Sequence, residues 1–271
     1  MWSVFVSYLT GNWSPHHVPG IEGDRGASEG VILMEKSFNC LSYWFPRLET
    51  TGVPVPQTKI VRYPGEKYWN MVGLLEGREG PGFHQLVASL QEAGTELGHP
   101  CFLRTGVCSG KHSFKDTCYI ATAEDFPRHV LNLVEESECA GLMGLPYDVW
   151  VVREYLPPVI CFSAFRGKLP ICKERRAFIS NGKVISIIPY WPEEAIHANK
   201  STPDGWREIL ADFNTSTEGE LGLLRELSER VARGFADAWS LDWMHTLRGW
   251  VAIDMALAKD SWGCPDELAD H

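Results

Sequence analysis

The sequence predicts an α+β fold in which mixed sheets are built partly from β-hairpins. Apolar residues make up 44% and charged residues 22% of the 271 residues, a balance typical of globular domains. Segments with strand character are interleaved with segments of helical periodicity, which indicates that both element types share a core. Asn181-Gly182 separates two β-branched runs and is a strong hairpin signal. The length fits one large domain or two modest ones.

The first hundred residues contain an apolar start, glycine-rich loops and two helical patterns. Residues 1–9 predict a strand, and residues 10–30 an exposed loop. Apolar spacing predicts helices over 31–48 and 86–97, the second of them stopped by Gly98-His99-Pro100. Between these helices we expect a turn over 51–58, a strand over 59–63 and a loop over 73–82.

Strand patterns dominate the remaining sequence. Thr122, with Asp125 three residues later, resembles a capping box and predicts the start of a helix. On that helix Val130, Leu133 and Val134 share one face, as expected of a side that packs on a sheet. The other expected elements are strands over 101–105, 114–120, 148–155, 177–179, 184–188, 240–243 and 249–254 and a helix over about 218–238.

Composition and charge exclude several classes of function. The 25 Lys and Arg against 35 Asp and Glu give a net charge of −10, which disfavours general binding of nucleic acid. No run of about 18 apolar residues is present to cross a membrane, and the apolar start lacks the basic leader of a signal peptide. Eight cysteines without a CxxC pair predict free, mostly buried thiols. We therefore expect a cytoplasmic protein.

The glycine-containing segment 106–112 differs from a P-loop. It is one residue shorter than GxxxxGK[ST], and His112 stands where Ser or Thr would hold magnesium. A P-loop leads into a helix whose amides bind phosphate, whereas a strand is expected here. The segment fits either a flap that closes over a triphosphate or an ordinary hairpin loop with surface lysines. A GxGxxG dinucleotide fingerprint is absent.

A group of cations surrounds this loop, and two acids follow on neighbouring strands. The cations are Arg104, Lys111, Lys115, Arg153 and Arg176. The acids are Asp242 and Asp254. Cations neutralise phosphate oxygens and carboxylates hold magnesium between phosphates, so the set suits a nucleotide with Mg²⁺. Each residue taken alone is also compatible with a solvated surface charge.

The order of these motifs resembles the ATP-grasp superfamily. It is most similar to the divergent clade that includes the eukaryotic cell-division-cycle assembly factor for translation initiation factor two. The resemblance covers roughly residues 51–262, and it is carried by segments 52–58, 97–100, 103–117, 151–155, 174–179, 241–242 and 253–256. It implies two α+β lobes with mixed or antiparallel sheets that hold ATP between them. The implied parts are a short N-terminal α/β segment over 1–50, a first lobe with the glycine flap over 51–156 and a second lobe with the metal strands over 157–271.

The resemblance also implies roles for individual residues. Asp242 and Asp254 would bind Mg²⁺, and the backbone at Glu154, Tyr155 and Leu156 would meet the adenine of ATP. Arg104, Lys111, Lys115, Arg153 and Arg176 would hold phosphates. Of these, Arg176 and Lys115 would act in catalysis.

The implied activity is ATP- and Mg²⁺-dependent ligation of a carboxylate to an amine through an acyl phosphate. Small molecules or peptides would supply the acid and the amine. One alternative is an ATP-binding assembly factor that clamps a protein partner without forming a bond. Another is a phosphotransferase that uses the same nucleotide site.

Two further features concern the metal site and the pocket for the acceptor. The family ends its last metal strand with acid-x-Asn, but Ala256 takes the third position here, which favours the clamp. Either Asp260 or a water supplies the missing ligand, or the metal site is weaker than is usual in the family. Arg175, Tyr190 and Trp191 could line the acceptor pocket, although Tyr190-Trp191 fits a packed aromatic pair better.

Overall fold

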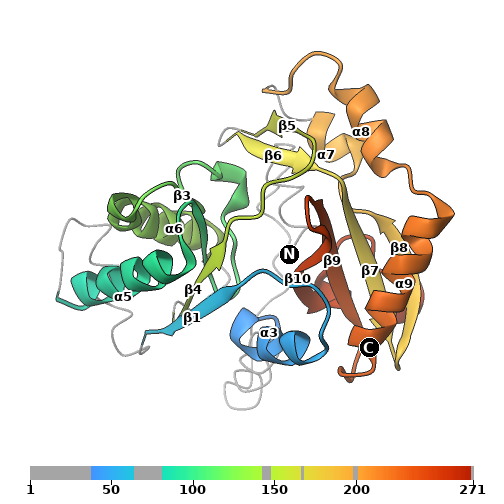
Figure 1. Cartoon of the computed structure of the whole chain (residues 1–271), viewed down its shortest axis with the longest axis horizontal. Helices are drawn as coiled ribbons and strands as arrows, with labels where there is room; N and C mark the ends of the chain where they lie inside the picture. Colours follow the sequence, from blue (N-terminus) through green and yellow to red (C-terminus); the bar gives the residue numbers. More distant parts are fainter. Residues whose placement is uncertain (1–37, 64–80, 142–147, 166–167, 198–200, 270–271) are drawn as a thin grey trace, which may run out of the picture.

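The chain is described by a computed structural model over residues 38–63, 81–141, 148–165, 168–197 and 201–269. The strand expected over 1–9 and the loop over 10–30 lie outside these residues, as does most of the loop over 73–82. Within them the fold is α+β, as the sequence predicts, with two four-stranded sheets and one two-stranded sheet, all antiparallel (Figure 1). No helix in this part of the chain has the length and apolar character needed to cross a lipid bilayer.

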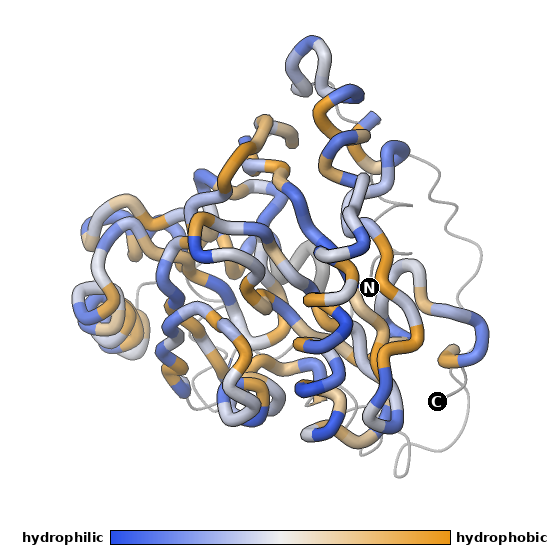
Figure 2. Tube along the Cα trace, turned by 45° about the vertical axis from the view of Figure 1, so that its right-hand side comes forward, coloured by the Kyte–Doolittle hydropathy of each residue, from blue (hydrophilic) through white to orange (hydrophobic). Residues whose placement is uncertain are grey.

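The first sheet has its two main helices on one face. Its strand order is β1–β4–β2–β3, formed by Thr58–Arg62, Val149–Glu154, Cys101–Thr105 and Tyr119–Ile120. The helices α5 (Pro81–Leu97) and α6 (Phe126–Gly141) bury Leu90 and Leu133 against Trp150 on β4. Hydrophobic and hydrophilic residues alternate around the helices, as expected where one side of each is buried (Figure 2).

The other face of the first sheet turns toward the second sheet. Because side chains alternate along a strand, Val151 points away from the neighbouring Trp150. Val151 belongs to a core that includes Trp44 of α3 (Leu41–Thr50) and Leu241 of the second sheet. Arg104 pairs directly with Val151 in the strand register, so its side chain points into the space between the two sheets.

The second sheet has strand order β10–β9–β7–β8. Its strands are Gly249–Leu257, Trp239–Thr246, Glu174–Ser180 and Lys183–Pro189. Helix α9 (Glu218–Ala232) covers one face, where Leu224 packs with Ala177 and Trp243. The opposite face of the same strands carries Arg176 and Asp242 and turns toward the first sheet.

A third, aromatic-rich core lies at one end of both sheets. The hairpin of β5 (Cys161–Ala164) and β6 (Leu169–Cys172) packs with α7 (Glu193–His197) and α8 (Trp206–Asn214). Phe162 of this hairpin stacks on Phe213 of α8, with ring centroids 6.1 Å apart. These elements were not predicted from the sequence.

Several local predictions are confirmed. The hairpin of β7 and β8 turns at Asn181-Gly182, whose φ angles of 50° and 75° are those of a type I′ turn. The Thr122 backbone N–H donates to the Asp125 carboxylate at 3.0 Å, which closes the expected capping box. The division of the chain into segments at 50 and 156 stays a prediction.

The strand expected over 114–120 is wrong in extent, since only Tyr119–Ile120 pairs as β3. The segment before it forms a 3₁₀ turn over Lys111–Ser113 and then a further turn. The reason is local: the Thr117 hydroxyl donates to the carbonyls of Gly110 and Ser113 and folds the backbone back. The helix expected to reach residue 238 ends at Ala232, just before Gly234.

Candidate functional site

Three charged side chains form a row across the cavity-facing side of the second sheet. In the register Arg176 on β7 pairs with Asp242 on β9, and Asp242 pairs with Asp254 on β10. The last pairing depends on a β-bulge at Ile253, because Ala252 already pairs with Trp243. Without that extra residue Asp254 would lie opposite Leu241 on the other face of the sheet. The bulge therefore brings both carboxylates to one face.

Arg176 and Asp242 form a buried, bidentate ion pair. The Arg176 Nε and Nη2 donate to the two carboxylate oxygens of Asp242 at 2.7 and 2.8 Å, and both residues are at most 6% exposed. Nη1 donates to the Trp262 carbonyl at 3.1 Å. Burial disfavours the charge of Arg176, but Asp242 outweighs it, so the pKa of Arg176 lies above its ordinary value.

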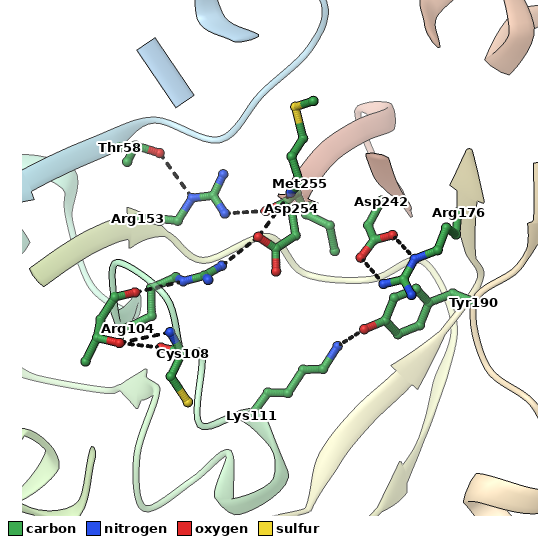
Figure 3. Close-up of polar contacts among 12 residues, drawn as sticks. Thr58, Arg104, Cys108, Lys111, Arg153, Arg176, Tyr190, Asp242, Asp254 and Met255 are labelled. Carbon is green, nitrogen blue, oxygen red and sulfur yellow. Dashed lines mark hydrogen bonds and ion pairs between the residues drawn. The ribbon is translucent and has the colours of Figure 1, made fainter. Parts of the chain in front are cut away.

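Two arginines of the first sheet approach the same row from across the cavity (Figure 3). Arg104 Nη1 donates to Asp254 Oδ1 at 3.0 Å. Arg153 donates from Nε to the Thr58 hydroxyl at 3.1 Å and from Nη1 to the carbonyl of Ile253, the bulge residue, at 2.5 Å. Its buried Nη2 has no hydrogen-bond partner among the residues that the structure describes. Burial and the nearby Arg104 lower the pKa of Arg153 to about 9, so an anion here would relieve an unfavourable charge.

Lys111 reaches the cavity from the turn after β2, between two aromatic rings. Its Nζ donates to the Tyr190 hydroxyl at 2.5 Å and lies 4.3 and 4.9 Å from the ring centroids of Tyr190 and Trp191. The Arg176 guanidinium lies 4.8 Å from the same Tyr190 ring. Burial opposes the charge of Lys111, but Tyr190 and Glu174 outweigh it and raise its pKa. Tyr190 therefore holds two of the cations in place.

Two adjoining cavities open onto these residues. The first, of about 160 Å³, extends from Lys111 and Arg176 past Tyr190 to Asn39, Asp260 and Ser261. The second, of about 130 Å³, extends to the end of β4 and to the β5–β6 hairpin. Both are lined by Arg104, Ser109, Lys111, Asp242 and Asp254. The charged row thus lies where the cavities meet.

The second cavity, which we call the hinge cavity, is walled by the predicted adenine-contact residues. Glu154, Tyr155 and Leu156 all line it, together with apolar side chains that include Phe102, Phe114, Leu169, Met244 and Ile253. The Glu154 carboxylate accepts from the Gln57 backbone N–H and from Arg248 Nη2, both at 2.8 Å. These bonds tie the end of β4 to the residue before β1 and to the turn between β9 and β10.

The structure brings most of the predicted site residues together, with one exception. Arg104, Lys111, Arg153, Arg176, Asp242 and Asp254 converge as described above, but Lys115 is exposed and lines neither cavity. The 3₁₀ turn over Lys111–Ser113 is the physical reason, because it replaces the strand that was expected to carry Lys115 into the site.

The aromatic pair and Arg175 have different roles from one another. Tyr190 and Trp191 pack edge to face at 4.9 Å, as favoured from the sequence, and each also contributes to a cavity wall. Arg175 donates to the Ser216 hydroxyl and to the Glu174 and Thr215 carbonyls. It therefore connects β7 to the segment between α8 and α9, and it lines neither cavity. Sequence reasoning missed Glu174, which is buried in the hinge cavity and accepts from Trp191 Nε1 at 3.1 Å.

The donor set suits a magnesium ion shared with phosphates and not a complete protein cage. Mg²⁺ commonly takes one or two carboxylates and fills its other positions with water and substrate phosphates. Asp242 and Asp254 supply two such carboxylates on one face. Among the described residues no group of three His, Cys, Asp or Glu side chains is placed to hold a metal. Asp260 lines the first cavity, where its carboxylate accepts from Asn39 Nδ2.

Comparison with solved structures identifies the fold as ATP-grasp-like. A C-terminally truncated Cdc123 from Schizosaccharomyces pombe matches with a TM-score of 0.54 and 12% identity, over 85% of this chain and 88% of that chain. A second structure of Cdc123 from that organism gives 0.53 and 13%, with the same coverage. At such identities the likeness establishes the fold alone.

Enzymes with a similar arrangement match over a smaller part of their own length. N5-carboxyaminoimidazole synthase from Aspergillus clavatus, solved with ADP and 5-aminoimidazole ribonucleotide, gives a TM-score of 0.45 and 10% identity, over 83% of this chain and 45% of that chain. No protein-family model matches the sequence, and a search of curated proteins gives no match.

His112 makes stability at the site dependent on pH. Burial and the nearby Lys111 lower its pKa from 6.5 to about 4, so the folded state keeps the imidazole neutral. As the pH falls below 6.5, His112 becomes protonated in the unfolded chain but stays neutral in the folded chain. The free energy of unfolding therefore decreases. Between pH 7 and 5 we expect His112→Gln to lose about 1–2 kcal/mol less than the parent in urea unfolding. Equal losses in both chains would contradict the buried neutral imidazole.

Proposed function

We propose that the two cavities bind ATP together with Mg²⁺. The adenine would occupy the hinge cavity beside Tyr155 and Leu156, and the triphosphate would extend to the charged row. The observation that carries this proposal is the gathering of four cations around two carboxylates where the cavities meet: Arg104 and Arg176 bond Asp254 and Asp242, while Lys111 and Arg153 lie beside them. Among the described residues the buried Arg153 Nη2 has no hydrogen-bond partner. A phosphate oxygen would supply the acceptor that this nitrogen lacks.

The charges of the cavities indicate why a metal would be required. Their described lining holds four Arg and Lys side chains but six Asp and Glu side chains. A triphosphate would therefore enter a region with no excess of positive charge, and a bound Mg²⁺ would neutralise oxygens of both the phosphates and the two aspartates. Arg104 and Arg176, which now neutralise Asp254 and Asp242, would then be released toward the phosphates.

The reaction that this arrangement supports best is ligation of a carboxylate to an amine. The first cavity continues beyond Arg176 and Tyr190, which leaves room for an acid next to the terminal phosphate. A carboxylate oxygen would attack the γ-phosphorus and ADP would leave; the amine would then attack the acyl carbon and phosphate would leave. Lys111 and Arg176 would hold the transferred phosphoryl group in line, so positioning and charge neutralisation would supply most of the rate.

One observation favours the alternative, an ATP-binding clamp for a protein partner. Ala256 stands where a third metal ligand would be, directly opposite Ser240 in the strand register. A site with two carboxylates can bind ATP–Mg²⁺ without holding it rigidly enough for rapid phosphoryl transfer.

Release of ADP and phosphate distinguishes the two functions. A ligase releases both only when a carboxylate and an amine are present together, which a panel of amino acids and dipeptides would detect. A clamp binds ATP, hydrolyses little and does not respond to the panel. Phosphorylation of an acceptor without any requirement for an amine would instead indicate a phosphotransferase.

Arg104→Ala tests the contribution of the first sheet. The side chain is buried, with its guanidinium on Asp254 at the junction of the cavities, so it would contact the phosphates once Mg²⁺ engages that carboxylate. Loss of one charge-assisted contact costs about 1.5–3 kcal/mol, so ATP–Mg²⁺ should bind about tenfold or more weakly in calorimetric titration. Arg47→Ala, which removes an exposed arginine on α3, is the matched control. If Arg104→Ala and Arg47→Ala bind ATP–Mg²⁺ with equal affinity, Arg104 does not contact the bound nucleotide.

A further inference from the structure

Two cysteines lie directly opposite each other on the β5–β6 hairpin. Cys161 begins β5 and Cys172 ends β6, and the register pairs them across the two strands. Opposite residues of an antiparallel pair have Cα atoms about 4.5–5.5 Å apart, within the range of about 4.4–6.8 Å that a disulfide spans. Both thiols are free in this structure.

The two thiols share a face of the hairpin that turns away from the aromatic core. Phe162 and Ile171, the next pair in the register, point into that core, so alternation directs both cysteines to the other side. Cys172 lines the hinge cavity, and its Sγ donates to Glu174 Oε1 at 3.4 Å. Cys161 is exposed. A reagent in solution can thus reach one thiol, while the other forms part of the cavity wall.

We propose that Cys161 and Cys172 are a redox modification site that small disulfides, such as oxidised glutathione, convert into an intrachain disulfide at the hinge cavity. The Cys161 thiolate attacks one sulfur of the reagent, which forms a mixed disulfide and releases one glutathione thiol. The Cys172 thiolate then attacks Cys161 Sγ and releases the second. Two electrons pass from the protein thiols to the reagent, and the two thiol protons leave with the released glutathione.

The modification changes the wall of the cavity that we propose for the adenine, so this consequence rests on the proposed function. In the disulfide, Cys172 Sγ turns toward Cys161 and gives up its hydrogen bond to the buried Glu174. Burial raises the pKa of both thiols, which keeps them protonated and slow to react at neutral pH. Disulfide formation should therefore be faster at mildly alkaline pH than at neutral pH.

The test treats the full chain with oxidised glutathione at mildly alkaline pH, quenches free thiols and maps peptides without reduction. We expect a peptide that links Cys161 to Cys172 and an intact mass lower by two hydrogen atoms. In Cys161→Ser the linked peptide should be absent. A glutathione adduct that persists on Cys161, or pairing of either cysteine with a different one, would overturn the proposed pair.

The consequence for the cavity is measured by titration of ATP–Mg²⁺ into the oxidised and reduced chains. We expect affinities that differ by about threefold or more, reversed by dithiothreitol, and no difference in Cys161→Ser treated in the same way. Equal affinities would overturn the link between the disulfide and the cavity. Absence of ATP binding in the reduced chain would instead refute the proposed function, because the peptide map reports the disulfide independently of any nucleotide.

Discussion

Asp254→Asn should weaken Mg²⁺-dependent ATP binding by about 100-fold or more while leaving the fold intact. The side chain is 36% exposed and faces the junction of the two cavities, so the isosteric amide fits there, and the buried Arg104 loses its counter-charge but keeps a hydrogen-bond acceptor. The amide oxygen can still accept from Arg104, but the negative charge that would hold Mg²⁺ is lost. Calorimetric titration of ATP with and without Mg²⁺ measures the change, because only the affinity with Mg²⁺ should fall.

Asp260→Asn is the matched control for this prediction. Asp260 lines the first cavity as well, but its carboxylate accepts from Asn39 Nδ2, and no third acid within the described residues completes a metal site. We expect Asp260→Asn to keep affinity for ATP–Mg²⁺ within about threefold of the parent. If Asp254→Asn also keeps its affinity, the metal role of the β10 carboxylate is refuted. A large loss in Asp260→Asn would show instead that this residue replaces the ligand missing at Ala256.

The pair of Arg176 and Asp242 should dominate the stability of the cavity face. Arg176→Met or Asp242→Leu each leaves a buried charge without its partner, since both residues are at most 6% exposed. Such a loss costs about 3–5 kcal/mol, which corresponds to a melting temperature roughly 10 °C lower for a chain of this size. Urea unfolding of either single variant measures it.

The double variant Arg176→Met with Asp242→Leu completes a double-mutant cycle with the parent and the two single variants. With both charges gone no buried ion remains unpaired, so most of the lost stability should return even though ATP binding does not. Single variants that lose less than about 1 kcal/mol would contradict the desolvated pair. A double variant as unstable as the sum of the single variants would contradict the coupling between the two residues.

Signals confined to a few neighbouring residues predicted much of the fold. Asn181-Gly182 located the β7–β8 hairpin because a type I′ turn needs positive φ at both positions. Thr122 and Asp125 located the start of a helical segment for a similarly local reason. The strand over 114–120 failed because Thr117 has β propensity but uses its hydroxyl to close a turn, a choice that propensity does not reveal.

The composition of the site was more accessible from sequence than its geometry. The order of motifs singled out Arg104, Arg176, Asp242 and Asp254, but it did not fix the face on which each lies. The bulge at Ile253 determines the face on which Asp254 lies. The residues around it carry no sequence signal that predicts an extra residue in this strand. The neighbouring Trp191 favours a packing role for Tyr190, whereas its contact with Lys111 joins positions 79 residues apart and leaves no local signal.

Thermal unfolding in the presence of nucleotide tests most directly whether the two cavities form an ATP–Mg²⁺ site. At 100 times its dissociation constant a ligand stabilises the folded state by about 2.7 kcal/mol. For a chain of this size the melting temperature should therefore rise by roughly 5–10 °C with ATP and Mg²⁺, and by much less with ATP and a chelator. The same rise should be absent in Asp254→Asn. No rise in the parent chain at millimolar ATP with Mg²⁺ would contradict the proposed site.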